Sequence, residues 1–173
     1  TLNGLVKKTP LEEFKNIRQT GKIAIGLKDN DELISVKLTS EDHQILVAAS
    51  NGKLVRFEGK DVRSMGRTAS GVRGINVDGS HVIGMTTDGE GQFIMAISEN
   101  GYGKMSPLED YRLSHRGGKG VKTINTTSKT GQLVALRAVN GNEDLLIITS
   151  EGIIIRLPME QVKTAGRNTQ GVR

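Results

Sequence analysis

The sequence has no cysteine and no tryptophan, only three prolines, and only two tyrosines and three phenylalanines among 173 residues. Without cysteine, the chain can form neither disulfide bonds nor thiolate metal sites. No apolar run approaches the roughly 18 residues that a membrane span requires, and no signal-peptide pattern stands at the start. A membrane partner is therefore not expected.

Signatures of catalysis and metal binding are also missing. There is no Walker A motif and no G-x-S-x-G elbow, and the three histidines are isolated from one another. The acidic stretch at 29–32 lacks the spacing of an EF-hand loop. We therefore predict no catalytic residue, no metal site and no bound cofactor in this chain, and an enzyme acting on its own has no residue support.

The chain repeats with a period of about 50 residues. Turn glycines recur at separations of 48, 49 and 51 residues, at Gly4, Gly52, Gly101 and Gly152. A cation follows each turn, at Lys8, Arg56, Lys104 and Arg156, and a second glycine recurs at Gly21, Gly71, Gly120 and Gly171. Such a period is typical of propellers and other arrays of small structural units.

Each repeat has the pattern of β-structure. Apolar runs at 43–50, 91–98 and 144–150 end at a turn, and each is followed by a second apolar run, as in a hairpin. Further strands are predicted at 82–87 and 132–139. We expect an all-β, propeller-like fold with about four strands per blade, holding roughly three blades and the start of a fourth. A β solenoid is the alternative, and residues 1–173 are interpreted as part of one domain of a longer protein.

Two short helical starts are predicted inside the repeats. Thr9 and Ser106 each precede a proline and have a glutamate three residues later, which is a capping-box pattern. We expect each to cap a single helical turn.

Positive charge is concentrated in the loops around the second glycine, at 16–22, 61–73, 111–122 and 161–173. These four basic loops hold half of the 24 lysines and arginines and a single acid, Asp61, in a chain of net charge +5. The cations are Arg18, Lys22, Arg63, Arg67, Arg73, Arg112, Arg116, Lys119, Lys122, Lys163, Arg167 and Arg173. Because a repeat protein presents equivalent loops along one edge, we predict a basic stripe that binds a polyanion such as DNA. Charge for solubility and a scaffold for an acidic protein are the alternatives.

The third basic loop combines its cations with Gly117, Gly118 and Gly120. Glycine permits positive φ and close approach of another backbone, so these residues favour either an anion-binding concavity of N–H groups or a tight crossing between blades. The scarcity of aromatic rings argues against a stacking platform for single strands. Duplex DNA, held by its backbone, is the better candidate.

Three segments, 66–75, 115–123 and 166–173, resemble the blade motifs of the C-terminal domain of DNA gyrase A, of a Gram-positive type. Segments 100–112 and 142–157 are similar to the same family. Its hallmark box, Q-R-R-G-G-K-G, matches Ser114, His115, Arg116, Gly117, Gly118, Lys119 and Gly120 in the last five positions. The related domain of the gyrase-A-like protein of topoisomerase IV is the alternative within the family.

The resemblance implies a β-pinwheel whose neighbouring blades share strands and whose basic rim wraps duplex DNA with a positive sense. It implies a role in ATP-dependent negative supercoiling by the A2B2 holoenzyme, a type II topoisomerase of the bacterial cytoplasm and nucleoid. The catalytic tyrosine would lie in the N-terminal part of gyrase A, and ATP and magnesium would be used elsewhere in the holoenzyme. Expected partners are duplex DNA, that N-terminal part and gyrase B, and the full box is expected upstream of Thr1.

Overall fold

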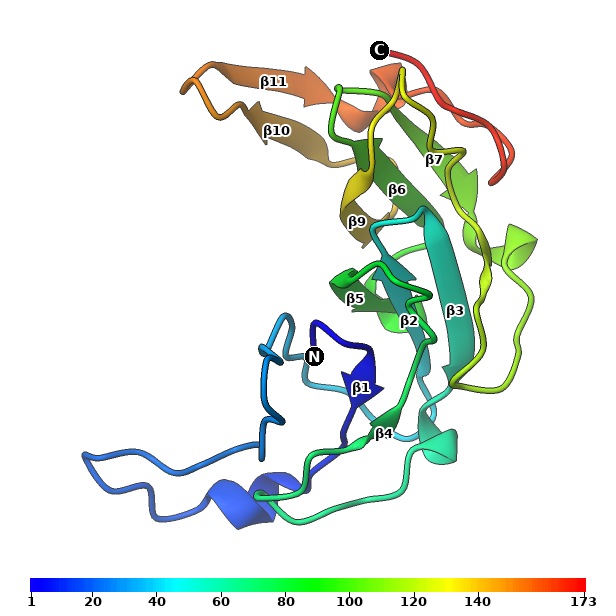
Figure 1. Cartoon of the computed structure of the whole chain (residues 1–173). Helices are drawn as coiled ribbons and strands as arrows, with labels where there is room; N and C mark the ends of the chain where they lie inside the picture. The colour runs from blue at the N-terminus through cyan, green and yellow to red at the C-terminus, as the bar shows by residue number, and fades with distance from the viewer.

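A computed structural model describes all residues, 1–173, and contains only β-strands and short 3-10 turns. Four groups of antiparallel strands follow one another along an open arc, as Figure 1 shows. The second group is the four-stranded sheet β5-β2-β3-β8, and the third is the sheet β7-β6-β9. The strands β1 and β4 pair at one end of the arc, and the hairpin β10-β11 stands at the other.

The strands are short, as the turn spacing predicts. Their bounds are β1 Leu5–Val6, β2 Gln44–Ala49, β3 Lys53–Glu58, β4 Val72–Arg73, β5 Val82–Thr87, β6 Phe93–Ser98, β7 Gly103–Pro107, β8 Val121–Lys122, β9 Leu133–Val139, β10 Asp144–Ile148 and β11 Ile154–Pro158. The 3-10 turns are η1 Leu11–Phe14, η2 Gly59–Asp61, η3 Asp88–Glu90, η4 Leu108–Asp110 and η5 Met159–Gln161.

Neighbouring units share strands. The short strand β8 leaves the third unit and pairs with β3 of the second, with Lys53 opposite Lys122. In the same way β4 pairs with β1, and Val172 bridges to Gly103 on β7. The predicted all-β, propeller-like fold is therefore confirmed, and the arc of blades favours it over a solenoid.

Both faces of each complete blade are buried, which explains the unbroken apolar runs of the sequence. On β2, Val47 points into one apolar cluster together with Phe57. The next residue, Ala48, points to the opposite face and packs with Ile94 and Leu136 of the third blade. The blades are thus held to one another by the same side chains that form the core.

The two ends of the arc carry exposed apolar side chains. Segment 15–43 forms no strand, and within it Val36 and Leu38 are 75% and 81% exposed. The hairpin β10-β11 exposes Ile148 and Ile154 in the same way. The inner blades, which are packed on both sides, bury the equivalent positions.

The predicted helical turns exist, but the predicted capping is wrong. The residue before η1 is Pro10 and the one before η4 is Pro107, and neither turn has a side-chain cap. Ser106 lies within β7, so its hydroxyl points sideways and donates to the carbonyl of Ala165 at 2.7 Å. The equivalent hydroxyl of Thr9 is buried and has no partner.

The structure corrects one position of the repeat. The turn spacing groups Lys104 with Lys8 and Arg56, but Met105 is the residue that occupies their place in the third unit. Three parallel bridges fix the register, namely Lys8 with Ser64, Arg56 with Leu113 and Met105 with Thr164. Because successive strand residues face opposite ways, the one-residue shift turns Lys104 inward.

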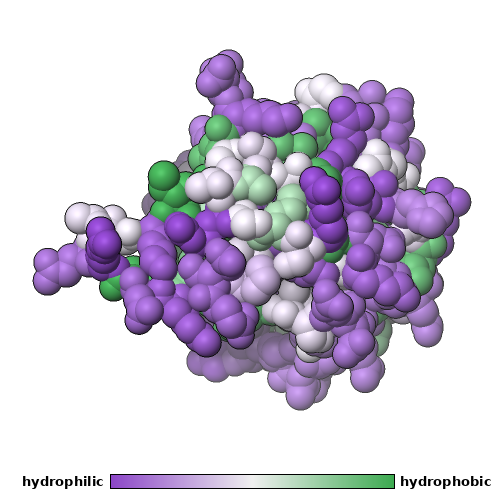
Figure 2. Space-filling view, turned by 90° about the horizontal axis from the view of Figure 1, so that it is seen from below, coloured by the Kyte–Doolittle hydropathy of each residue, from purple (hydrophilic) through white to green (hydrophobic).

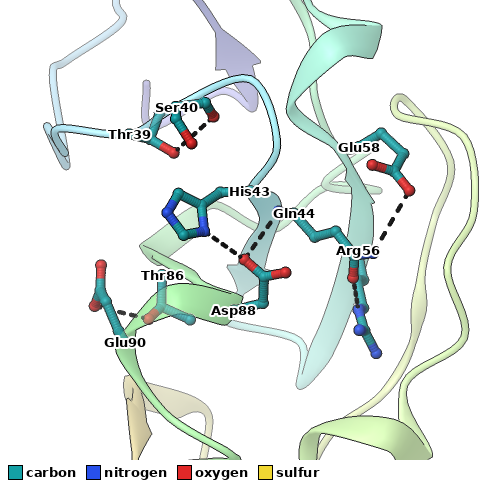
Figure 3. A network of polar contacts seen from close by, with 9 residues as sticks. All are labelled: Thr39, Ser40, His43, Gln44, Arg56, Glu58, Thr86, Asp88 and Glu90. Carbon is teal, nitrogen blue, oxygen red and sulfur yellow. Dashed lines mark hydrogen bonds and ion pairs between the residues drawn. The ribbon is translucent and has the colours of Figure 1, made fainter.

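The cations Lys8 and Arg56 join blades and do not face a ligand. Lys8 Nζ donates to the carbonyl of Gly59, at the start of η2, at 3.2 Å. Arg56 Nη1 donates to the equivalent carbonyl of Leu108, at the start of η4, at 2.9 Å. Figure 3 shows Arg56 beside Gln44, which accepts a hydrogen bond from Nε at 2.7 Å.

Candidate nucleic-acid interface

The second, third and fourth basic loops (61–73, 111–122 and 161–173) share one geometry. Each leaves its own blade through a 3-10 turn and crosses to the outer strand of the preceding blade, on the convex side of the arc (Figure 1). The recurring glycine stands at the crossing with φ of +97°, +74° and +80° in the three loops. A Cβ on Gly120 would lie 2.3 Å from the carbonyl oxygen of Leu54, and the equivalent glycines are similarly crowded. These glycines therefore permit the close crossing.

The first basic loop, 16–22, differs from the other three. It pairs with no strand, and a Cβ on Gly21 would meet nothing within 4 Å. Arg18 is exposed, while Lys22 donates its Nζ to the carbonyl of Lys15. Aligned on the recurring glycine, neither cation falls at a position where the other loops carry one.

The cations of the three crossing loops occupy three repeated positions. The register of the shared strands, together with the recurring glycine, aligns them residue by residue. The first row is Arg63, Arg112 and Lys163, the middle row is Arg67, Arg116 and Arg167, and the last row is Arg73, Lys122 and Arg173. The repeat thus presents the same charge at the same place on three successive blades.

The first and last rows are available for a ligand. All six of these residues are exposed. Five of them make no side-chain hydrogen bond or ion pair, and Lys122 makes only a long one, 3.4 Å, to the side chain of Asn125. The middle row differs, because its arginines are half-buried and donate to main-chain carbonyls. The molecule seen from below is largely hydrophilic, as Figure 2 shows.

The box-like residues 114–120 are divided between contacts to the protein and open backbone. Ser114 donates its main-chain N–H to the carbonyl of Arg56 at 2.9 Å, and Gly117 donates to Gly74 at 2.6 Å. His115 is exposed. The N–H groups of 118, 119 and 120 have no acceptor in the protein, so they are free to bind an anion.

Lys119 is held by an acid that the sequence did not single out. Its Nζ lies 3.1 Å from Asp78 Oδ2, and Lys53 Nζ lies 3.8 Å from the same oxygen. The hydrogen bond and charge of Lys119 hold the pKa of Asp78 below its usual range, with a smaller effect of Lys53. A carboxylate therefore occupies a place where a phosphate would meet two lysines.

Lys104 is the one fully buried cation beneath the loops. Its side chain is 0% exposed, and its Nζ donates to the carbonyl of Gly166 at 2.5 Å and to Thr169 Oγ1 at 3.2 Å, both in the fourth loop. Burial lowers the pKa of Lys104 to about 8, helped by the charge of Arg167 and opposed by Asp110. Lys7 is its equivalent in the first unit, and burial lowers the pKa of Lys7 as well.

We expect Lys104 to make the domain more stable as the pH rises above 8. Its pKa is about 8 in the folded chain against a usual 10.5, so the unfolded chain holds more protons between these values. The free energy of unfolding should therefore rise by about 2 kcal/mol between pH 7 and pH 9.5 from this residue. Urea unfolding of the wild type and of Lys104→Met at both pH values measures the difference. An identical pH dependence in both proteins would contradict the lowered pKa.

The structure offers no metal centre, since no three histidine, aspartate or glutamate side chains converge on one point. None of its helical segments has the length and hydrophobicity to cross a bilayer. The chemistry on display is a curved array of exposed cations and open N–H groups, carried by rigid blades. Such an array defines a binding module for polyanions within the class of propeller-like repeat proteins.

The chain belongs to the family of the DNA gyrase C-terminal domain, described as a β-propeller, whose family model matches residues 1–40, 43–87, 92–140 and 143–173. Each matched segment contains one of the four turn glycines. The chain is 44% identical to DNA gyrase A of Ureaplasma parvum and, over all of its length, equally similar to that of Staphylococcus epidermidis. It spans about a fifth of these relatives, 21% and 20% of their length.

Two solved structures have the same fold. The C-terminal domain of DNA topoisomerase IV superposes with a TM-score of 0.91 at 22% identity, over 98% of this chain and 54% of that one. A DNA gyrase A C-terminal domain superposes with a TM-score of 0.88 at 24% identity, over 99% of this chain and 58% of that one. At these identities the structures establish the fold alone.

Proposed function

We propose that this chain binds duplex DNA along the convex side of its blades and bends it around them, as part of the C-terminal domain of a bacterial gyrase A. The observation that carries the proposal is the threefold repetition of exposed cations in the first and last rows. Equal charges at equal positions on a curved scaffold fit a polymer whose phosphates repeat evenly and which must bend to follow them.

The contacts would be made to phosphates and would not read bases. The first and last rows neutralise phosphates, the free N–H groups of 118–120 bind one directly, and the middle row and Lys119 add charge. Arg18 and Lys22 would extend the track only if the first loop meets the same DNA. Within the holoenzyme, the wrap would serve ATP-dependent negative supercoiling together with gyrase B and the N-terminal part of gyrase A, at the nucleoid in the cytoplasm.

Two other functions compete with this one. The topoisomerase IV domain has the same fold, but the relatives at 44% identity are gyrase A proteins, which favours the gyrase assignment. A scaffold for an acidic protein would also use the cations. It would bind one compact partner and would be indifferent to the length of DNA offered.

The proposal is tested by ligating a nicked circular plasmid with the chain bound and counting linking-number changes at several salt concentrations. We expect a positive shift that grows with protein and fades with salt. If about eight phosphates are neutralised, the logarithm of the binding constant should fall with that of the salt concentration at a slope near −7. A slope near zero would contradict phosphate binding, and clear binding without a shift would contradict wrapping.

Replacing Asp78 should strengthen DNA binding. In Asp78→Asn, Lys119 and Lys53 lose the carboxylate that now pairs with them, so both can meet a phosphate without competition. We expect affinity for a long duplex at 0.1 M salt to rise several-fold, by about 1 kcal/mol, because an exposed ion pair is worth little on its own. Fluorescence anisotropy of labelled DNA measures the change.

Asp144→Asn is the matched control for this substitution. Asp144 is 44% exposed, close to the 45% of Asp78, and is also paired, with Arg156 of β11. It lies outside the basic loops, so only the change of net charge is shared. Equal gains in the two variants would mean that Asp78 acts through net charge and not through Lys119.

A further inference from the structure

The middle row of arginines makes contacts that charge alone does not require. Arg116 of the third loop donates from Nε to the carbonyl of Asp61 at 2.9 Å and from Nη1 to the carbonyl of Arg73 at 3.1 Å. Asp61 begins the second loop and Arg73 ends it. One guanidinium of the third loop therefore holds together the two ends of the loop before it.

The same contact recurs one blade further along. Arg167 of the fourth loop donates from Nε to the carbonyl of Asp110 at 3.1 Å and from Nη1 to that of Lys122 at 3.2 Å. These are the equivalent ends of the third loop. Arg67 of the second loop makes the corresponding Nη1 bond to Ile23, just after the first loop, at 2.9 Å. The arginines thus join each basic loop to the preceding one.

A repeated main-chain hydrogen bond lies beside each arginine. In the middle joint, the N–H of Asn76 donates to the carbonyl of Gly118 at 2.8 Å. The equivalent bonds of the other two joints run from Gly26 to Ala69 and from Asn125 to Thr169. This backbone bond fixes one point between two loops, and the arginine adds two directions, so the pair fixes the spacing and the angle.

We propose that Arg67, Arg116 and Arg167 are positioning residues that set the spacing and angle of consecutive DNA-binding loops, and thereby how far bound DNA is wrapped. The proposal rests on the DNA-wrapping function for its second half only. A planar guanidinium can serve two carbonyls at once, whereas a lysine with the same charge presents a single nitrogen. Arg→Lys in this row therefore separates geometry from charge.

The spacing is tested without DNA. Because the chain has no cysteine, Ser64→Cys and Leu113→Cys place one spin label at the equivalent exposed position of the second and third loops. Pulsed electron paramagnetic resonance then gives the distribution of distances between them. We expect Arg116→Lys to broaden and shift this distribution. The matched control is Arg73→Lys, the same change at an exposed guanidinium without a protein partner. An unchanged distribution in Arg116→Lys would overturn the proposal.

The wrap is tested by the plasmid assay on Arg116→Lys with Arg167→Lys, against Arg73→Lys with Arg112→Lys. We expect both pairs to keep the salt slope of the wild type, since charge is conserved. The linking-number shift per bound chain should fall by about half only in the first pair, because two of three joints lose one of their two directions. If that pair instead loses affinity in proportion to its shift, the arginines are phosphate contacts and the proposal is wrong.

A second joint protects the test against misfolding. Should Arg116→Lys lose the circular dichroism and cooperative unfolding of the wild type, Arg167→Lys is measured with labels at Leu113→Cys and Thr164→Cys. Its joint involves the last loop only. If the wild type proved not to bind DNA, the function proposed above would fail, while the distances would still decide whether the arginines space the loops.

Discussion

Replacing the first row with glutamine, in Arg63→Gln, Arg112→Gln and Lys163→Gln together, should weaken binding to duplex DNA by on the order of a hundredfold at 0.1 M salt. These three side chains are exposed and contact nothing in the protein, so their charge is free for phosphates. Each lost phosphate contact removes one counterion release. The salt slope should therefore become shallower by about 3, which anisotropy titrations at several salt concentrations measure.

The unfolding midpoint is the internal control for this triple variant. Exposed side chains without partners contribute little to stability, so the midpoint in urea should stay within the change expected of surface substitutions, about 0.5 kcal/mol. Replacing three cations outside the basic loops, Lys37, Lys60 and Arg137, by glutamine alters net charge equally. An equal loss of affinity in both variants would show that the rows are not a specific track.

Much of the fold could be predicted because the repeat reports it several times over. The strand pattern around Val47 recurs in the later units, and so do the turn glycines, so a local ambiguity in one copy is settled by another. The concentration of charge in the loops was also readable, since it needs only the position of each residue in the repeat. Both predictions depend on local sequence.

The details of the site depended on contacts between units, which local sequence does not report. Ser106 resembles a helix cap, yet a strand of the next loop offers it the carbonyl of Ala165. Asp78 pairs with Lys119 of another loop, and Arg116 binds carbonyls of the loop before it. The only sequence signal for Arg116 was its recurrence with Arg67 and Arg167, and recurrence alone does not distinguish a ligand contact from a joint.

Gly120→Ala should destabilise the domain by about 3 kcal/mol or more. The residue has φ of +74°, which costs a non-glycine residue about 1 to 2 kcal/mol. Its new Cβ would also lie 2.3 Å from the carbonyl oxygen of Leu54 and 3.0 Å from Val55 Cγ2, so the third loop would have to lift from the second blade. Chemical unfolding followed by circular dichroism measures the loss.

Gly118→Ala separates this effect from a general intolerance of the loop. Its Cβ would approach no atom closer than 3.9 Å, so the change should be about 0.5 kcal/mol or less. The two glycines stand two residues apart in the same box-like loop, yet only Gly120 lies where β8 joins β3. If both variants were equally unstable, the loop would be needed as a flexible segment. If only Gly120→Ala is unstable, the glycine of the box is conformationally required because one blade completes its sheet with a strand from the next.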